Sequence, residues 1–335
     1  MFYKLRAFWS QSFGIPTPPL TEKNLPDQTG KVFLVTGSNT GVGYQVASIL
    51  YAHNAKVWVA ARTESKALAA IEDIKKEHPK SQGKLEFLYL NLSDLTTIKA
   101  SAEDFLSRED KLHWLNNNAG VMTPPPGSKG AQGSDLTYQT NILGPFLFTK
   151  LLLPILKRTA ENEPKGSVRV SWAGSLAVDL QSPNGGAVWT KGKDGEETLD
   201  GEKDNRLAYG VSKAANYFFG TEFGKRFGDR DGVLHNSYNP GNLASELQRH
   251  VAAQYPTFAI WLLHKLLYPV IYGAYTEIYS GLAPELTLQK DQGGYIIPWG
   301  REGSVRPDLI DEAKKESGQA SRLFEWCERV TKEFA

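Results

Sequence analysis

The chain has 335 residues, of which 38 are basic and 37 acidic, and its formal net charge is +1. This balance, without any run of Lys and Arg, argues against a nucleic-acid partner. A single cysteine, Cys327, excludes an intrachain disulfide, and one Cys with six scattered His does not form a zinc site of the usual spacing. We therefore expect an intracellular, cytoplasmic protein that holds no metal.

The N-terminal residues 1–13 carry several aromatic side chains, but polar residues interrupt them, so they do not form the apolar core of a signal peptide. An apolar helix most often packs on its own domain, and we favour that interpretation. Peripheral contact with a membrane surface is the open alternative. The most apolar window, 255–275, is broken by His264, Lys265 and Pro269, so we predict no transmembrane span.

Strand and helix signals alternate after an extended, proline-rich lead-in at residues 14–30. The predicted strands are 31–35, 56–61, 85–90, 112–115, 168–172, 233–237 and 295–298. Predicted helices begin near residues 42, 63 and 93, run from about 135 to 157, contain Tyr209, and end the chain with the stripe Leu323, Phe324, Cys327 and Val330. Alternating strands and helices predict an α/β fold with a Rossmann-type, doubly wound parallel sheet and helices on both faces. We expect one domain, residues 31–335, because no repeat or linker divides it.

Tyr209 and Lys213 are the most informative pair of residues in the sequence. Residues four apart on a helix project from the same side, so the phenol and the ammonium should lie together. A neighbouring cation lowers the pKa of a phenol from its usual value near ~10 and suits it to proton transfer. Of the fourteen tyrosines, only Tyr209 has Lys four positions on. By spacing alone, a packed Tyr beside a solvated Lys is the alternative interpretation.

A glycine-rich turn, Thr36 to Gly43, lies between the first predicted strand and the first predicted helix. Glycines let the backbone approach a pyrophosphate, and the N-terminus of the helix offers N–H donors. The spacing differs from Gly-x-Gly-x-x-Gly, but the position between strand and helix favours a dinucleotide site.

Together these motifs resemble the short-chain dehydrogenase/reductase family over about residues 31–241. Segments 117–122 and 141–146 look most similar to its retinol dehydrogenase and WW-domain oxidoreductase branch, and segment 297–301 is similar to fungal members. The resemblance implies cofactor contacts from Gly37, Ser38, Asn39, Thr40, Gly41, Val42, Gly43, Asn91, Asn118, Ala119, Gly120, Tyr209, Lys213, Pro240, Gly241 and Leu243. Asn91 stands where the family usually has Asp, and its carbonyl oxygen could still accept a bond from the adenine amino group.

The same resemblance implies a catalytic set of Asn141, Ser175, Tyr209 and Lys213. Tyr209 would be the general acid, with its pKa lowered by Lys213, which would also bind the nicotinamide ribose. Ser175 would donate a hydrogen bond to the carbonyl oxygen of the substrate, and Asn141 would hold a helix irregularity and a relay water. Ser171 is the alternative to Ser175, although it is more typical of a strand residue.

Cofactor choice depends on the end of the second predicted strand, Ala61-Arg62-Thr63. An acidic residue there would bind the 2′-hydroxyl of NAD, and none is present. Arg62 could instead pair with the 2′-phosphate of NADP, although a solvated Arg is the plainer interpretation. The sequence therefore favours NADP(H) over NAD(H).

The resemblance also implies that the region at about 242–285, which follows the Pro240-Gly241 turn, caps the substrate pocket. Met122 and residues 124–126 should lie near the same entrance. The large apolar residues of the capping region are Leu243, Leu247, Tyr255, Phe258, Ile260, Trp261, Leu262, Leu263, Leu266, Leu267 and Tyr268. Such walls suit an apolar aldehyde or ketone. The alternative is that these side chains form core or a surface between copies of a homo-oligomer.

Two further alternatives stay open. Segment 179–206 makes the distance from Ser175 to Tyr209 longer than is usual in the family, and it is either a surface loop or a flap at the substrate entrance. The whole protein could also be a catalytically silent nucleotide-binding scaffold or regulatory protein on the same fold, since fold does not fix function. The complete set of Asn141, Ser175, Tyr209 and Lys213 favours an enzyme.

Overall fold

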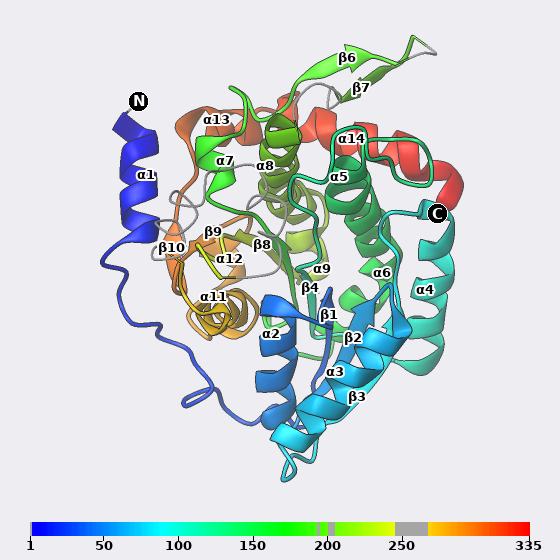
Figure 1. The fold of residues 1–335 in the computed structure, drawn as a ribbon, viewed down its shortest axis with the longest axis vertical. Coiled ribbons are helices and arrows are strands. Elements are labelled where there is room, and N and C mark those ends of the chain that lie inside the picture. The colour runs from blue at the N-terminus through cyan, green and yellow to red at the C-terminus, as the bar shows by residue number, and fades with distance from the viewer. Residues whose placement is uncertain (1, 193–194, 200–204, 245–266) are drawn as a thin grey trace.

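The computed structural model describes residues 2–192, 195–199, 205–244 and 267–335, and Figure 1 shows their arrangement. An eight-stranded sheet in the order β10-β9-β8-β5-β4-β1-β2-β3 forms its centre. Its strands are β1 (Val32–Thr36), β2 (Lys56–Ala61), β3 (Lys84–Tyr89), β4 (Trp114–Asn117), β5 (Arg169–Ala173), β8 (Leu234–Tyr238), β9 (Tyr295–Ile297) and β10 (Arg301–Gly303). Neighbouring strands pair in parallel except β9 with β10. The predicted Rossmann-type sheet is confirmed, with strand bounds within two residues of those expected.

Helices cover both faces of the sheet because its strands are apolar on both sides. In β1, Phe33 and Val35 join one hydrophobic cluster while Val32 and Leu34 join the other, as expected for side chains that alternate along a strand. The first cluster contains α2 (Gly41–Ala52), α3 (Glu64–Glu77) and α11 (Val270–Leu282). The second contains α4 (Leu95–Arg108), α6 (Gly144–Ala160) and α8 (Asn205–Phe223).

Shorter helical elements connect and extend these layers. They are α5 (Leu136–Tyr138), the π-helix η1 (Gln139–Leu143), α7 (Ala177–Leu180), the π-helix η2 (Gly224–Gly228), α9 (Asp229–Asp231), α12 (Leu288–Asp291), α13 (Pro307–Lys314), α14 (Gln319–Thr331) and the 3-10 helix η5 (Lys332–Phe334). The helix predicted from 135 to 157 is therefore interrupted by a π turn. On α14, the predicted stripe buries Leu323, Phe324 and Cys327, and Phe324 packs 4.9 Å from Phe146 between ring centroids.

The N-terminal segment forms helix α1 (Phe2–Ser12), which stands beside α7 at the margin of the molecule (Figure 1). Tyr3 donates a 2.8 Å hydrogen bond to the Ser304 carbonyl, and Gln11 is buried. The segment packs on its own domain through polar contacts, whereas its apolar Phe2, Leu5 and Trp9 are exposed, so the alternative of a membrane contact stays open. Residues 14–30 then run without regular strand or helix to β1, apart from turns.

Two short strands form a hairpin within the long segment between Ser175 and Tyr209. They are β6 (Trp189–Lys191) and β7 (Glu197–Leu199), which pair antiparallel and lie next to α14 (Figure 1). The Trp189 indole donates a 2.6 Å hydrogen bond to Gln319, and Glu197 pairs with Arg322. The sequence predicted neither this hairpin nor β10, because strands of three residues carry too little periodicity to detect.

The region expected to cap the substrate pocket is described only in part. Residues 245–266, with Leu247, Tyr255, Phe258, Ile260, Trp261, Leu262, Leu263 and Leu266, lie outside the described residues. Most of 267–285 forms α11, whose Ala274 and Ile278 are buried against the sheet. This part of the region covers the sheet and supplies core side chains.

Candidate active site

Four neighbouring strands, β1, β4, β5 and β8, end at the same edge of the sheet. Each is followed by predicted site residues: Gly37 after β1, Asn118 after β4, Ser175 after β5 and Pro240 after β8. In open α/β sheets, ligands bind beyond the carboxyl ends of the strands. The fold therefore brings together, at one edge, residues that are far apart in the sequence.

Tyr209 lies on α8, close enough to Ser175 for a side-chain hydrogen bond between them to act on the phenol. It is 8% exposed, and burial raises the pKa of Tyr209 to about 12, although the bond with Ser175 acts in the opposite direction. The prediction that its pKa lies below the usual phenol value is wrong for this structure, because desolvation outweighs every other influence.

Lys213 lies one turn further along α8 and is also buried. Its Nζ is 5.6 Å from the centroid of the Tyr209 ring and donates a 2.8 Å hydrogen bond to the Ala173 carbonyl at the end of β5. Burial lowers the pKa of Lys213 to about 8, and the nearby Glu277 carboxyl raises it in part. The expected proximity of ammonium and phenol is confirmed.

Asn141 lies in the π-helix η1, so the expected helix irregularity is present at this residue. Its Oδ1 accepts a 2.8 Å bond from Val121 N, and its Nδ2 donates to Val121 O at 2.9 Å and to Ser212 Oγ at 3.1 Å. Asn141 therefore holds the turn after β4 against α8, close to Lys213. A π-bulge at this point is typical of a functional site.

Ser171, the alternative to Ser175, is a strand residue. It lies within β5, fully buried, and its Oγ accepts bonds from Trp114 Nε1 at 2.9 Å and Ser280 Oγ at 3.0 Å. Ser175 instead follows the strand and touches Tyr209. The geometry supports the assignment of Ser175.

The glycine turn after β1 is packed closely against the turn after β4. Gly37 has φ of +68°, and a Cβ there would lie 3.0 Å from Ala119. A Cβ at Gly43 would lie 2.6 Å from Asn118 Nδ2, which donates a 2.7 Å bond to the Thr36 carbonyl. Side chains at these two positions would push the turns apart, so the glycines are needed for the shape of the turn.

Helix α2 begins at Gly41, and its N-cap residue Thr40 makes no side-chain capping bond. A Cβ at Gly41 would meet nothing within 4 Å, so space is open in front of the helix. Uncapped N–H groups beside open space suit a phosphate. Asn39, Thr40 and Val42 are partly or fully exposed in this turn, whereas the Ser38 hydroxyl is buried and donates to the Val35 carbonyl at 2.7 Å.

Arg62 is exposed directly after β2. Gly37 N donates a 2.8 Å bond to the Ala60 carbonyl, which places the end of β2 beside the glycine turn. Asn91 follows β3, but its Oδ1 already accepts bonds from Ser93 N at 3.2 Å and Ser93 Oγ at 2.7 Å. An adenine amino group could use this oxygen only if the Ser93 hydroxyl turned away.

The turn after β8 completes the edge. Gly241 has φ of +98° and donates from its N–H to Asn239 Oδ1 at 3.0 Å. Leu243 is buried and lies against Gly273 of α11, which is also close to Val42 of the glycine turn. Leu243, which is predicted to contact the cofactor, and Val42 at the start of α2 therefore both pack near Gly273 of α11.

Comparisons with known proteins identify what this arrangement is. The sequence model of the family described as "short chain dehydrogenase" matches residues 31–178. A short-chain dehydrogenase/reductase of Phomopsis amygdali is 42% identical, with 99% of this chain and 98% of that protein covered. One from Emericella nidulans, pkfC, is 40% identical, covering 96% of this chain and 99% of that protein.

The chain belongs to the short-chain dehydrogenase/reductase family. Among solved structures, a protein from Mycobacterium paratuberculosis is similar with a TM-score of 0.67 and 22% identity, covering 93% of this chain and 97% of that one. Levodione reductase is similar with a TM-score of 0.60 and 18% identity, covering 78% of this chain and 95% of that one. These structures support the fold, and the assignment to the retinol dehydrogenase branch stays a prediction.

This short-chain dehydrogenase/reductase also has a buried polar cluster that the sequence did not indicate. Asn116 Nδ2 donates to Glu277 Oε2 at 2.6 Å, and the Tyr238 hydroxyl donates to Asn116 Oδ1 at 2.8 Å. All three are buried between the sheet and α11, and burial raises the pKa of Glu277 to about 8. The one available signal was the lone acid in the otherwise uncharged helix 270–282.

Met122 and residues 124–126, which the sequence predicts to lie near the substrate entrance, follow β4. Met122 is partly buried, and Pro124 is buried, with its carbonyl accepting a 2.6 Å bond from Asn205 at the start of α8. Pro125 and Pro126 are exposed. The turn after β4 is thus attached to the helix that carries Tyr209.

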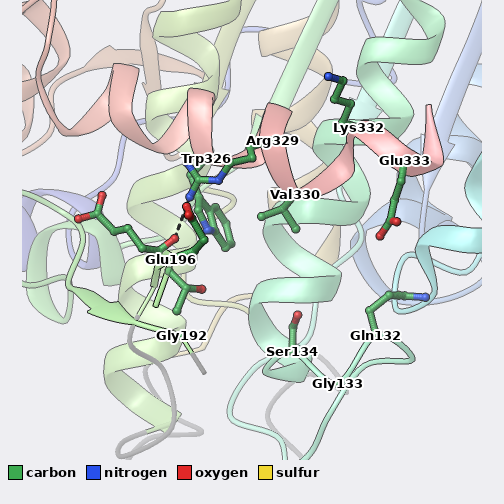
Figure 2. A pocket seen from close by; sticks show the side chains of 12 residues that line it. Gln132, Gly133, Ser134, Gly192, Glu196, Trp326, Arg329, Val330, Lys332 and Glu333 are labelled. Atoms are coloured by element: carbon green, nitrogen blue, oxygen red, sulfur yellow. Dashed lines mark hydrogen bonds between the residues drawn. The ribbon is translucent and has the colours of Figure 1, made fainter. Parts of the chain in front are cut away.

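A cleft of about 990 Å³ lies elsewhere, between the β6–β7 hairpin, the end of α14 and the loop at 132–134. Figure 2 shows Arg329, Glu196 and Ser134 among the residues around it. None of Asn141, Ser175, Tyr209 or Lys213 lines it, so it is separate from the catalytic edge. Within the described ranges, no group of His, Cys, Asp and Glu is arranged to hold a metal ion, and no helix is long and apolar enough to span a bilayer.

Proposed function

We propose that this oxidoreductase is an NADP(H)-dependent enzyme that interconverts an apolar aldehyde or ketone and its alcohol. The observation that carries the proposal is the placement of Tyr209 at the carboxyl edge of the sheet. There it is bonded to Ser175 and lies next to Lys213, and the uncapped start of α2 belongs to the same edge. A phenol and a hydroxyl that lie next to one another can both bond a carbonyl oxygen.

NADPH, when bound, supplies the hydride. Gly37, Gly41 and the start of α2 would hold its pyrophosphate, and Lys213 would bind its nicotinamide ribose. The residues present fit such a nucleotide, because open space at Gly41 adjoins uncapped helix N–H groups.

The chemistry of the protein itself is proton transfer and charge stabilisation. Ser175 donates a hydrogen bond to the substrate oxygen and stabilises the negative charge that develops there. Tyr209 donates its proton to the same oxygen. A pKa raised to about 12 keeps the Tyr209 phenol protonated near neutral pH, which is the form that reduction requires.

The preference for NADP(H) is supported by Arg62, which is exposed after β2 where no carboxylate is present among residues 61–63. An Arg pairs well with a 2′-phosphate. The solved structure of RhlG from Pseudomonas aeruginosa, similar with a TM-score of 0.56 and 21% identity, covering 78% of this chain and 94% of that one, is described as a complex with NADP. That description belongs to RhlG, and we extend it here as a proposal.

The test is consumption of NADPH and of NADH by the purified protein with a panel of carbonyl compounds. The panel pairs long aliphatic and aromatic aldehydes and ketones with pyruvate as a small charged keto acid. We expect turnover with NADPH on apolar members and little on pyruvate. A protein that binds NADPH but turns over no member of the panel would instead support the silent scaffold, and a preference for NADH would contradict the assigned cofactor.

A further inference from the structure

Helix α1 precedes the segment that the family model matches, yet one of its side chains joins two loops of the catalytic edge. Gln11 is 2% exposed. Its Oε1 accepts a 2.7 Å bond from Asn239 Nδ2, and its Nε2 donates to Asp179 Oδ2 at 3.3 Å. Asn239 follows β8 directly before the Pro240-Gly241 turn, and Asp179 lies on α7, four residues after Ser175.

The partners of Gln11 are themselves fixed. Asn239 Oδ1 accepts from Gly241 N at 3.0 Å, and Asn239 N donates to the Ile296 carbonyl at 2.8 Å. Asp179 Oδ1 accepts from Arg306 N at 2.9 Å. Asn239 therefore links Gln11 to the turn at Gly241. Asp179 links Gln11 to the Ser175 loop through its own backbone N–H, which donates to the Leu176 carbonyl at 3.0 Å.

The next residue of α1 extends the same contact. Ser12 Oγ accepts a 2.8 Å bond from Asn242 Nδ2, and the Ser12 carbonyl accepts from the Tyr268 hydroxyl at 3.1 Å. The end of α1 thus binds the chain on both sides of the 245–266 segment. Buried hydrogen bonds of this kind are costly to lose, because the partners are left unsatisfied.

We propose that Gln11 is a positioning residue for the reaction: it sets the Ser175 loop and the 239–242 turn relative to one another. Gln11 touches neither substrate nor nucleotide and acts through Asn239 and Asp179. The role rests on the proposed function, since those two loops are assigned there to the carbonyl oxygen and the nicotinamide.

The test compares Gln11→Met with Ser10→Ala. Met keeps the length and the helical preference of Gln but makes neither bond, whereas Ser10 Oγ bonds only within the helix, to the Ala7 carbonyl. For Gln11→Met we expect kcat to fall about 10-fold and NADPH affinity to weaken, at a temperature where both variants are folded. Ser10→Ala should match the wild type. Gln11→Met with wild-type kcat and affinity, and a lowered Tm alone, would overturn the proposal.

A double-mutant cycle with Asn239→Ala sharpens the test. If Gln11 acts through Asn239, the two losses in NADPH affinity should be markedly less than additive. Additive losses would contradict the proposal. Because the affinity is measured by fluorescence titration without substrate, it separates a failure of this inference from a failure of the proposed carbonyl reduction.

The opposite face of α1 carries a second, independent observation. Phe2, Leu5 and Trp9 are 91%, 60% and 67% exposed and follow one another at helical spacing, while the polar Gln11 is buried. Helix α1 therefore buries a polar side chain and exposes its apolar stripe to solvent. Exposed apolar stripes of this kind mark contact surfaces.

The charges around the stripe favour a lipid surface as the occupant. Arg6 is exposed beside the stripe, and residues 2–12 contain no Asp or Glu, whereas the Lys4 ammonium donates a 3.2 Å hydrogen bond to the Leu180 carbonyl of α7. Trp and Phe beside basic residues are typical of helices that lie in a membrane interface. A helix of 11 residues is only about 16 Å long, so the stripe is far smaller than the roughly 800 Å² per partner of a stable dimer.

We infer that α1 rests on an anionic lipid surface through Phe2, Leu5 and Trp9. The test is co-sedimentation of the full chain with phosphatidylcholine vesicles that contain or lack phosphatidylserine. We expect binding to the anionic vesicles that falls with salt and is lost in a Phe2→Ser, Leu5→Ser, Trp9→Ser variant, but not in Leu68→Ser, which removes an exposed apolar side chain from α3. No binding at low salt, or a dimer that disappears in the triple variant, would overturn the inference.

Discussion

Two buried tyrosines, Tyr209 and Tyr238, lie on different sides of the sheet, and their surroundings differ. Burial raises the pKa of both hydroxyls. Tyr209 reaches the carboxyl edge and bonds Ser175, whereas Tyr238 donates to Asn116 inside the cluster with Glu277. The difference teaches that a perturbed pKa does not by itself identify a proton donor. What distinguishes Tyr209 is its position at the carboxyl edge of the sheet, where we propose that the substrate oxygen binds.

Replacing each tyrosine with Phe gives the sharpest form of this comparison. Tyr209→Phe removes the proposed donor, so turnover should fall by ~10² to 10⁴-fold while NADPH affinity persists. Tyr238→Phe should leave the chemical step near the wild-type rate but destabilise the fold by about 1–3 kcal/mol, because the buried Asn116 Oδ1 loses its hydrogen-bond donor. Single-turnover kinetics and urea unfolding measure the two effects. Near-native turnover of Tyr209→Phe would refute the mechanism.

Substitution of Lys213 should have a different effect from substitution of Tyr209, because we propose that Lys213 both lies next to Tyr209 and binds the nicotinamide ribose. Lys213→Ala should lower turnover and NADPH affinity together, each by about 10- to 100-fold, since it removes a charged hydrogen-bond donor. Fluorescence titration with NADPH and steady-state turnover check this. A variant that loses turnover but keeps full affinity would restrict Lys213 to the chemistry of Tyr209.

Arg62 follows β2, away from both tyrosines. Its substitution therefore tests only the preference for NADPH over NADH. Arg62→Ala should weaken NADPH by about 10-fold and leave NADH unchanged, because only NADPH has a 2′-phosphate to pair with the guanidinium. Lys66→Ala, an exposed change on α3 nearby in sequence, is the matched control. Equal weakening for the two nucleotides would mean that Arg62 acts on the turn and not on the phosphate.

Glu277 belongs to the cluster around Tyr238, and its charge also acts on Lys213 next to Tyr209. When ionised it raises the pKa of Lys213, which burial lowers to about 8. In Glu277→Gln the pKa of Lys213 should fall below about 8, so Lys213 loses its proton at lower pH and NADPH affinity declines at lower pH than in the wild type. The shift should be small, because burial raises the pKa of Glu277 to about 8 and keeps it largely neutral near pH 7.

NADPH affinity measured across the pH range checks this sign. The Lys213 ammonium donates to the Ala173 carbonyl and lies near the Tyr209 ring, and neither group is charged near pH 7. The exposed Glu103→Gln on α4 should leave the profile unchanged. If the midpoint of the pH dependence of NADPH affinity in Glu277→Gln stays in place or moves to higher pH, Glu277 does not raise the pKa of Lys213.

The sequence was sufficient for the parallel sheet, because apolar strand signals alternate with helix signals along most of the chain. It also predicted Tyr209, Lys213 and the glycine turn from local spacing, and Ser175 from the family resemblance, and the structure brings these residues to the same edge of the sheet. It did not indicate Glu277 or Gln11, whose importance depends on partners far along the chain, Asn116 and Asn239. The pKa of Tyr209 was predicted in the wrong direction, because the depth of burial is a property of packing.

The β6–β7 hairpin is the region from which we expect the smallest effect. In the described part of the hairpin, Trp189 bonds Gln319 and Glu197 pairs with Arg322, and both of these partners lie on α14. Trp189→Ala should therefore lower stability by about 1–2 kcal/mol, for a half-buried aromatic ring, and change KM less than about two-fold. Gln319→Ala is the control that removes only the hydrogen bond. If Trp189→Ala instead changed KM strongly for bulky carbonyls while Gln319→Ala did not, the hairpin would act as a flap at the substrate entrance.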